Sequence, residues 1–245
     1  MAKKRLDARL VEQYPEYSRT QLQSWILQGK VLVNGVPEKK AGTTIADDAE
    51  VILTAEQPKF VCRGGLKLEK ALDAFQIDVR GRTILDAGIS TGGFTDCLLQ
   101  RGAAKVYGVD VGYGQVHEKI RTDERVVVIE RTNLRTYEHR GDPIDLVTLD
   151  LSFISLLKVM DAVKKLLGPG GILITLIKPQ FEAEKGEVPA GGVIKDASQR
   201  EQIVKKVVAG IEASGFTCRG VVESPIKGGE GNVEFLAYFV RGDRT

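Results

Sequence analysis

Two charged residues of this sequence, Asp150 and Lys178, each follow directly after a largely apolar run. The two runs are 144–149 and 171–177, and both have the character of strands that are buried in a parallel sheet. Ligands of open α/β sheets bind at the carboxyl ends of the strands, so charges at these positions are candidates for chemistry. A neutral lysine at such a position can take a proton from a substrate hydroxyl. The arrangement predicts a site in which Lys178 is a general base.

Two further charged residues, Lys67 and Glu234, lie where a fold of this kind brings chain segments together at the mouth of the sheet. Lys67 lies beside the apolar stripe of a predicted helix, 68–75, although a solvated surface lysine is the alternative interpretation. We expect Asp150 and Glu234 to orient the two lysines and Lys67 to position the substrate. Burial and the second cation favour the neutral form of Lys178, whereas the two carboxylates favour the charged form, so the sequence leaves this balance open.

A glycine-rich loop after the first strand of this segment reads Asp86-Ala-Gly88-Ile-Ser-Thr-Gly92-Gly93. Glycine lets the backbone turn sharply and approach a ligand closely. A dinucleotide-binding loop would read Gly-x-Gly-x-x-Gly, but this loop is Gly-x-x-x-Gly-Gly and is led by an acidic residue. S-adenosylmethionine has no pyrophosphate, and it carries an amino group and a sulfonium for which the Asp86 carboxylate is suited. The loop therefore favours S-adenosylmethionine as the cofactor.

Other residues complete the predicted cofactor site. Asp110 ends the second strand and can accept hydrogen bonds from ribose hydroxyls. Asn133 is placed to meet the adenine, although a loop-turning asparagine is the alternative. The expected cofactor-binding residues are Asp86, Gly88, Ser90, Thr91, Gly92, Gly93, Asp110 and Asn133. We expect no bound metal, because the 2 histidines and 3 cysteines have no neighbours at ligand spacing.

The elements that carry these residues alternate between strand and helix. Apolar runs that read as buried parallel strands cover 83–85, 105–109, 126–129, 144–149 and 172–177. Two later runs, 216–222 and 233–240, are joined only by a loop and predict a hairpin with an antiparallel strand. The pattern predicts an α/β fold, a Rossmann-like seven-stranded sheet of the class I methyltransferase type.

The first 57 residues have a different pattern, which predicts two short helices, a hairpin and a further strand. Ser18 is placed to cap the second helix, and Asn34-Gly35 forms the hairpin turn. Pro58 interrupts regular structure. We therefore expect a small α+β domain over 1–57, a linker over 58–63 and the larger domain over 64–245, which suits a length of 245 residues.

Composition limits the class of protein. A content of 42% hydrophobic and 28% charged residues is that of a globular chain and excludes a disordered one. The longest apolar run is far shorter than the roughly 20 residues of a membrane helix, and the charged N-terminus lacks the apolar core of a signal peptide. We expect a cytoplasmic protein. The net charge of +2 is too small to indicate a nucleic-acid partner by itself.

The N-terminal segment resembles a known module. Ser18-Arg19-Thr20, Ile26, Gly29 and Val33-Asn34-Gly35 are similar to the small αL RNA-binding module of a small-subunit ribosomal protein and of many pseudouridine synthases. Acidic residues equal the basic ones in this segment, but the basic ones gather at the N-terminus and around the hairpin. The residues expected to contact RNA are Lys3, Lys4, Arg5, Arg19, Lys30 and Arg63.

Motifs along the whole chain resemble the TlyA family, also labelled haemolysin A. They are Arg63-Gly-Gly-Leu-Lys67, Gly88-Ile-Ser-Thr-Gly-Gly-Phe-Thr95, Val109-Asp-Val-Gly-Tyr-Gly114, Asp150-Leu-Ser-Phe153, Lys178-Pro-Gln-Phe181 and Gly231-Asn-Val-Glu234-Phe. The resemblance implies an FtsJ-like domain whose Lys-Asp-Lys-Glu tetrad falls on Lys67, Asp150, Lys178 and Glu234. It also implies 2′-O-methylation of cytidine in ribosomal RNA, with ribosomal RNA or ribosomal subunits as partners.

One departure and several alternatives accompany this resemblance. Ile89 stands where the family commonly has alanine, and we expect it to add bulk beside the cofactor. Methyltransferases that act on base nitrogens often carry Asn-Pro-Pro-Tyr where this chain has Asp150-Leu-Ser-Phe153, which favours a ribose oxygen as the target. A membrane-active haemolysin and an inactive RNA-binding assembly factor are the alternative functions.

Overall fold

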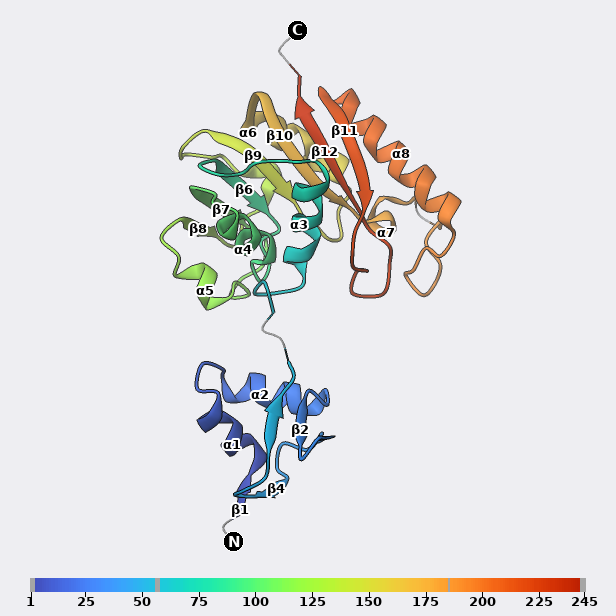
Figure 1. Cartoon of the computed structure of the whole chain (residues 1–245). Helices are drawn as coiled ribbons and strands as arrows, with labels where there is room; N and C mark the ends of the chain where they lie inside the picture. Colours follow the sequence, from blue (N-terminus) through green and yellow to red (C-terminus); the bar gives the residue numbers. More distant parts are fainter. Residues whose placement is uncertain (1–2, 56–57, 185, 243–245) are drawn as a thin grey trace. The chain divides into compact units, whose positions relative to one another are not determined.

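The computed structural model describes residues 3–55, 58–184 and 186–242. The chain divides into two compact units, Met1–Gln57 and Pro58–Thr245 (Figure 1). The ends of the expected segments at residues 1, 57 and 245 lie outside the described residues. Among the described helices, none is long and apolar enough to cross a membrane.

The N-terminal unit consists of two helices and two small antiparallel sheets, ordered β3-β2-β5 and β1-β4. Ser18 caps α2, because its Oγ accepts a hydrogen bond of 3.2 Å from the backbone N–H of Gln21. The sequence pattern did not indicate β1 and β4, which have three residues each. The elements are β1 Lys3–Arg5, α1 Leu6–Gln13, α2 Arg19–Leu27, β2 Val31–Val33, β3 Val36–Pro37, β4 Thr44–Ala46 and β5 Val51–Leu53.

The C-terminal unit is built on a seven-stranded sheet in the order β11-β12-β10-β9-β6-β7-β8. β12 runs antiparallel to both of its neighbours, and the pairs from β10 to β8 are parallel. The strands are β6 Thr83–Ala87, β7 Lys105–Val109, β8 Val126–Ile129, β9 Ile144–Leu149, β10 Leu167–Ile177, β11 Phe216–Glu223 and β12 Phe235–Arg241. This sheet confirms the predicted α/β fold and its antiparallel final strand.

Helices cover both faces of this sheet (Figure 1). One apolar core lies between the sheet and helices α6 and α8, and the other lies between the sheet and α3, α4 and α5. Successive strand residues alternate between them, so that Val147 of β9 belongs to the first core and Leu146 to the second. The helices are α3 Gly64–Ala74, α4 Gly93–Gln100, α5 Glu118–Arg121, α6 Met160–Leu166, α7 Pro179–Glu182 and α8 Ala197–Ala213, with 3-10 turns η1 Leu134–Thr136 and η2 Leu156–Val159.

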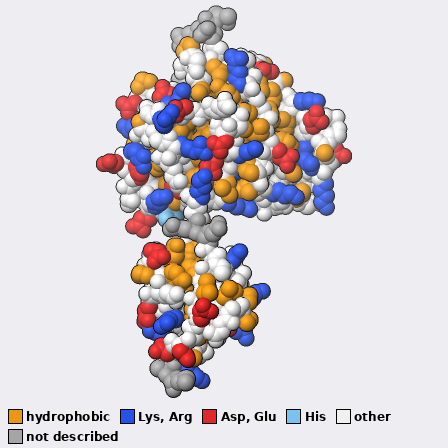
Figure 2. Space-filling view, in the orientation of Figure 1, with side chains coloured by type: hydrophobic (Ala, Val, Ile, Leu, Met, Phe, Trp, Pro, Cys, Tyr) orange, Lys and Arg blue, Asp and Glu red, His pale blue; other side chains and the backbone are white. Residues whose placement is uncertain are grey.

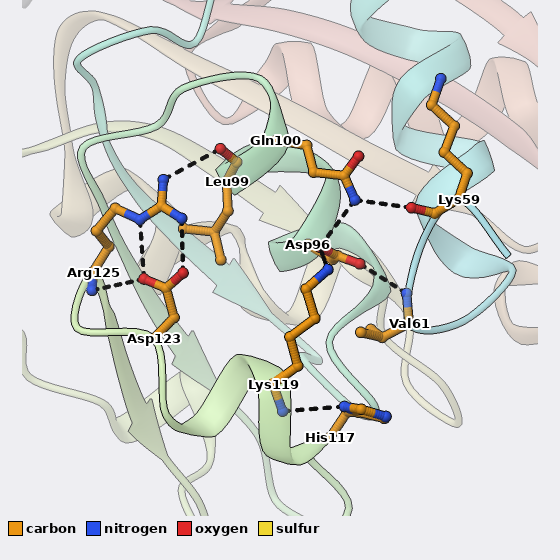
Figure 3. A network of polar contacts seen from close by, with 9 residues as sticks. All are labelled: Lys59, Val61, Asp96, Leu99, Gln100, His117, Lys119, Asp123 and Arg125. Carbon is orange, nitrogen blue, oxygen red and sulfur yellow. Dashed lines mark hydrogen bonds and ion pairs between the residues drawn. The ribbon is translucent and has the colours of Figure 1, made fainter. Parts of the chain in front are cut away.

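Residues 58–63, which we expected to form a linker, have no regular secondary structure and are part of the C-terminal unit. Phe60 is buried in the core beneath α3 and α4. Figure 3 shows how the buried Asp96 of α4 holds this segment, because it accepts a 2.8 Å hydrogen bond from the backbone N–H of Val61. The same carboxylate accepts from Lys119 at 3.0 Å and from Gln100 at 3.1 Å. The entry to α3 is thereby fixed to α4 and α5.

Candidate active site

Strand register brings the predicted site residues to one edge of the sheet. Leu149 of β9 pairs with Ala87 of β6 and with Thr175 of β10, all in parallel. The glycine-rich loop, Asp150 and Lys178 therefore leave the sheet at its common carboxyl edge. β12 begins at Phe235, opposite Ile177 in the antiparallel register, so Glu234 reaches the same edge from the opposite direction.

Lys178 is paired with Asp150 at this edge. Its Nζ lies 2.6 Å from Oδ1 of Asp150 and donates a 2.9 Å hydrogen bond to Oγ of Ser152. Lys178 is only 8% exposed, and a buried ammonium needs partners of this kind to offset the loss of water. The lysine is therefore held in a defined orientation at the end of β10.

Lys67 and Glu234 form a second buried ion pair. The Nζ of Lys67 lies 2.5 Å from Oε2 of Glu234, and the two residues are 8% and 3% exposed. Lys67 comes from α3, and Glu234 precedes β12. The alternative interpretation of Lys67 as a solvated surface lysine is therefore wrong.

Two glycines of the loop after β6 allow close backbone contacts around the pairs. Gly88 has a φ of +83°, and a Cβ there would lie 2.4 Å from the carbonyl oxygen of Asp150. A Cβ on Gly93 would lie 2.5 Å from Sγ of Cys62 and 2.9 Å from the backbone nitrogen of Gly65. The first contact joins the loop to Asp150, and the second holds it against the start of the helix that carries Lys67.

A cleft of about 380 Å³ opens beside the Lys178–Asp150 pair. This volume is within the usual range for small-ligand sites, roughly 300–1,000 Å³. Four of the expected cofactor residues line it, and four do not. Those that line it are Gly88, Ser90, Asp110 and Asn133; those that do not are Asp86, Thr91, Gly92 and Gly93.

Asp110 and Asn133 organise the walls of the cleft. Oδ2 of Asp110 accepts a 2.8 Å hydrogen bond from the N–H of Ser90, and Oδ1 accepts one of 2.7 Å from the N–H of Gly112. Each carboxylate oxygen keeps further lone-pair capacity for a ligand hydroxyl. Asn133 lines the cleft and also caps η1, because its Oδ1 accepts a 3.0 Å hydrogen bond from the N–H of Arg135. Asn133 therefore turns the loop and also lines the cleft, and its contact with adenine stays a prediction.

Asp86 differs from its expected position beside the cationic groups of a cofactor. Its side chain is fully buried, and the hydroxyls of Thr95 and Thr148 each donate a 2.7 Å hydrogen bond to it. Burial raises the pKa of Asp86 to about 6, although these two hydrogen bonds act in the opposite direction. The Asp86 side chain at the end of β6 therefore links this strand to α4 and β9 through hydrogen bonds in the interior.

The expectation that Ile89 adds bulk beside the cofactor is wrong. Ile89 is buried in the core beneath α3 and α4 and does not line the cleft. A Cβ on Gly108 of β7 would lie only 2.2 Å from Cδ1 of Ile89, so the missing side chain at 108 provides the space for the isoleucine. Residue 89 therefore alters the core rather than the ligand site.

The sequence did not single out Ser152 and Phe153. Phe153 is 90% exposed, has a φ of +64° and lies with its ring centroid 5.0 Å from that of Phe181. A bulky residue at positive φ is uncommon and often marks a functional position. The motif Asp150-Leu-Ser-Phe153 drew attention to this segment, but the sequence did not indicate that the Phe153 side chain is exposed.

Within the described chain, no group of three or more His, Cys, Asp or Glu could hold a metal ion.

The expected RNA-binding residues of the N-terminal unit are partly tied to acidic neighbours. Arg5 donates two hydrogen bonds, of 3.0 and 3.1 Å, to the buried Asp7, and Arg19 donates one of 2.8 Å. The Arg5 guanidinium beside Asp7 holds the pKa of that carboxyl well below its usual value. Lys4 pairs with Glu12, while Lys3 and Lys30 are exposed. Arg63, also exposed, precedes α3 in the other unit.

Surface charge is mixed on the face seen in Figure 2, where basic and acidic side chains intermingle on both units. The guanidinium groups of Arg5 and Arg19 nonetheless converge on one carboxylate of α1, and more than half of each side chain stays exposed. Two cations on one anion leave a locally positive spot. This is the best-organised cationic feature among the expected RNA contacts.

Comparisons with known proteins agree with this geometry. Residues 60–241 match the FtsJ-like methyltransferase family, and residues 4–51 match the S4 domain. The chain is 45% identical to the 16S/23S rRNA (cytidine-2′-O)-methyltransferase TlyA of Mycobacterium tuberculosis, over 96% of this chain and 88% of the relative. It is also 45% identical to Hemolysin A of Brachyspira hyodysenteriae, over 94% and 96%.

A solved structure extends the likeness to the fold of the whole chain. A protein from Streptococcus thermophilus described as a hemolysin superposes with a TM-score of 0.74 at 39% identity, covering 99% of this chain and 90% of that one. The matched methyltransferase domain and the cleft at the strand ends make S-adenosylmethionine the cofactor. The chain therefore belongs to the TlyA family, in which an S4 domain precedes an FtsJ-like methyltransferase domain.

Proposed function

We propose that this protein methylates the 2′-hydroxyl of a cytidine ribose in ribosomal RNA. The observation that carries the proposal is the ion pair of the buried Lys178 with the half-buried Asp150, which lies at the strand ends beside the cleft. A ribose hydroxyl is a poor nucleophile, so its methylation benefits from a base beside the methyl donor. The substrate named for the Mycobacterium tuberculosis relative supports ribosomal RNA and cytidine.

The described cleft suits S-adenosylmethionine, which supplies an electrophilic methyl group on its sulfonium. The carboxylate of Asp110 is available to the ribose hydroxyls of the cofactor. Val109, Val111 and Leu134 form apolar walls that suit an adenine ring, and Asn133 adds a polar group beside them. Gly88 also lines this cleft, and its missing side chain lets the loop after β6 pack against the carbonyl oxygen of Asp150.

Lys178 acts as the base in this proposal. Bound S-adenosylmethionine would supply an electrophilic methyl group to the ribose oxygen, and Lys178, in its neutral form, would take the proton that the hydroxyl loses. Asp150 then stabilises the resulting ammonium at 2.6 Å. Glu234 holds Lys67 through the 2.5 Å ion pair, and Lys67 positions the substrate. Alignment of the two reactants adds to the rate.

Phe153 provides a surface for the target nucleotide. Its side chain is almost fully exposed beside the cleft, and its ring lies against that of Phe181. A ribose can reach a recessed site only when its nucleotide leaves the stack, and an exposed aromatic ring can take up the base. Stacking of this kind contributes about 1–3 kcal/mol per base.

Residues 1–57 dock the RNA in this proposal, and residues 64–245 carry out the chemistry. Arg5 and Arg19 are the phosphate contacts of the first segment, because their guanidinium groups are exposed and fixed by Asp7. Lys3, Lys30 and Arg63 add weaker, solvated charge, whereas Lys4 is paired with Glu12. The S4 domain match supports this assignment.

Mapping of ribose methylation tests the proposal. Unmodified ribosomal subunits are incubated with the protein and S-adenosylmethionine, and 2′-O-methyl groups are located by resistance of the RNA backbone to alkaline cleavage. We expect new methylation at cytidine. Methylation of a base nitrogen, or none on any ribosomal substrate, would overturn the proposal.

A further inference from the structure

We propose that Ser152 is a positioning residue that fixes the direction in which Lys178 presents its lone pair to the substrate hydroxyl. The inference rests on the proposed function, because it assigns a role within the same transfer step. Ser152 was not among the residues that the sequence singled out.

The argument begins with the hydrogen-bond capacity of Lys178. A neutral amine has two N–H groups and one lone pair in tetrahedral directions. Nζ donates a hydrogen bond of 2.9 Å to Oγ of Ser152, which fixes the direction of one N–H. Oδ1 of Asp150 lies 2.6 Å away as an ion-pair partner without hydrogen-bond geometry, and its negative charge disfavours a lone pair that points toward it. Without the Ser152 hydroxyl, no hydrogen bond among the described residues fixes the orientation of this amine.

The surrounding structure holds Ser152 in place. The segments after β9 and β10 contact each other at three points: Ser152 with Lys178, the ring of Phe153 with that of Phe181, and the N–H of Leu156 with the Glu182 carboxylate at 2.8 Å. Glu182 is largely buried, and burial raises the pKa of its carboxyl. The positive φ of Phe153 turns that residue outward directly after Ser152. These contacts hold the segment that carries Ser152 against the segment after β10, while Ser152 itself is exposed.

Another role for Ser152 follows from its position, because its side chain also lines the cleft. A serine that served the cofactor would change the affinity for S-adenosylmethionine. A serine that directs Lys178 would change the rate of transfer with cofactor and RNA saturating. The two roles are therefore separable by measurement.

The experiment uses the full chain and three variants. Ser152→Ala removes the hydroxyl, Ser152→Thr keeps it, and Ser155→Ala is the matched control, because Ser155 lies in the same segment but its hydroxyl contacts Leu157 and Glu182 rather than Lys178. Single-turnover methylation of ribosomal subunits is measured at saturating S-adenosylmethionine, together with cofactor affinity by calorimetry and a melting curve for each protein.

We expect Ser152→Ala to slow the transfer step about tenfold, a typical loss when a reacting group is misaligned. Cofactor affinity and melting temperature should stay near those of the wild type, and Ser152→Thr and Ser155→Ala should keep most of the rate. An unchanged rate in Ser152→Ala would overturn the inference, as would weaker cofactor binding with a normal rate at saturating cofactor, or a loss of rate that Ser152→Thr shares. If the wild type forms no 2′-O-methyl group at all, the proposed function fails instead.

Discussion

Nζ of Lys67 and Oε2 of Glu234 lie 2.5 Å apart, although 167 positions of the sequence separate the two residues. Both side chains are almost fully buried, so each charge depends on the other. Removal of one partner from a buried pair leaves an uncompensated charge, whereas replacement of both by apolar residues can be nearly neutral.

The first prediction follows from this pair. Glu234→Gln should lower the free energy of unfolding by about 3–5 kcal/mol, because the ammonium of Lys67 loses its counter-charge. The double variant Lys67→Met, Glu234→Leu should recover much of that stability but should not methylate. Urea unfolding curves and a methylation assay measure both effects. Equal stability of Glu234→Gln and wild type would show that the pair is not buried in solution.

Lys178→Ala should slow single-turnover methylation about a hundredfold or more, which is the usual contribution of a general base. Affinity for S-adenosylmethionine should remain within a few fold, because Lys178 does not line the cleft. A fall in RNA affinity would instead identify a phosphate contact. A lower melting temperature with a parallel loss of activity would identify a structural partner of Asp150.

Asp110→Ala should weaken cofactor binding, since charge-assisted hydrogen bonds contribute about 1.5–3 kcal/mol. The variant also removes the acceptor for the N–H groups of Ser90 and Gly112, which shape the cleft. Asp110→Asn keeps one of those acceptor oxygens, so it should lose less affinity for S-adenosylmethionine than Asp110→Ala. Calorimetry with S-adenosylmethionine gives both values, and wild-type affinity in Asp110→Ala would place the ribose contact elsewhere.

Arg19→Ala should weaken RNA binding and flatten its dependence on salt. Loss of one phosphate contact should reduce the slope of log affinity against log salt by roughly 0.7–0.9. Arg80→Ala is the control, because that arginine pairs with Asp78 in the other unit. Binding titrations with ribosomal RNA at several salt concentrations measure the slope. Indistinguishable slopes for the two variants would remove Arg19 from the interface.

The raised pKa of Asp86 predicts a specific pH dependence of stability. The folded carboxyl titrates near pH 6 and the unfolded one near its ordinary value of 3.8, so the folded state holds the proton more tightly between these values. This contribution to stability is complete below the unfolded pKa and is lost as the pH rises through about 6. Asp86→Asn should lack this loss. Urea unfolding curves of the wild type and of Asp86→Asn at pH 4.5 and 7.5 measure this loss. An equal change in the free energy of unfolding of the two proteins would argue against a raised pKa of Asp86.

Much of the sheet could be predicted from the sequence, because each buried strand is a continuous apolar run between polar loops. The same reasoning placed Asp150 and Lys178, since a charge directly after such a run lies at the carboxyl edge. It could not place Asp86. Whether a strand-end carboxylate faces a ligand or the interior depends on Thr95 and Thr148, which belong to other elements.

Side-chain direction also explains the error at Ile89. A loop residue between two ligand-binding positions was expected to face the ligand, but Gly108 on the neighbouring strand leaves room for it in the core. The exposure of Phe153 depends similarly on a positive φ that its residue type does not indicate. These features arise from contacts between distant segments, which a single sequence does not encode as a local pattern.

The place of β12 between β10 and β11 has a consequence for the order in which the enzyme becomes competent. Synthesis proceeds from the N-terminus, so Lys67 emerges long before Glu234 and waits without its partner while most of the sheet is made. Strand β12 must then insert beside strands that precede it in the chain. We therefore expect a nascent chain that ends before Glu234 to lack the buried ion pair, even though every residue that lines the cleft has already been made.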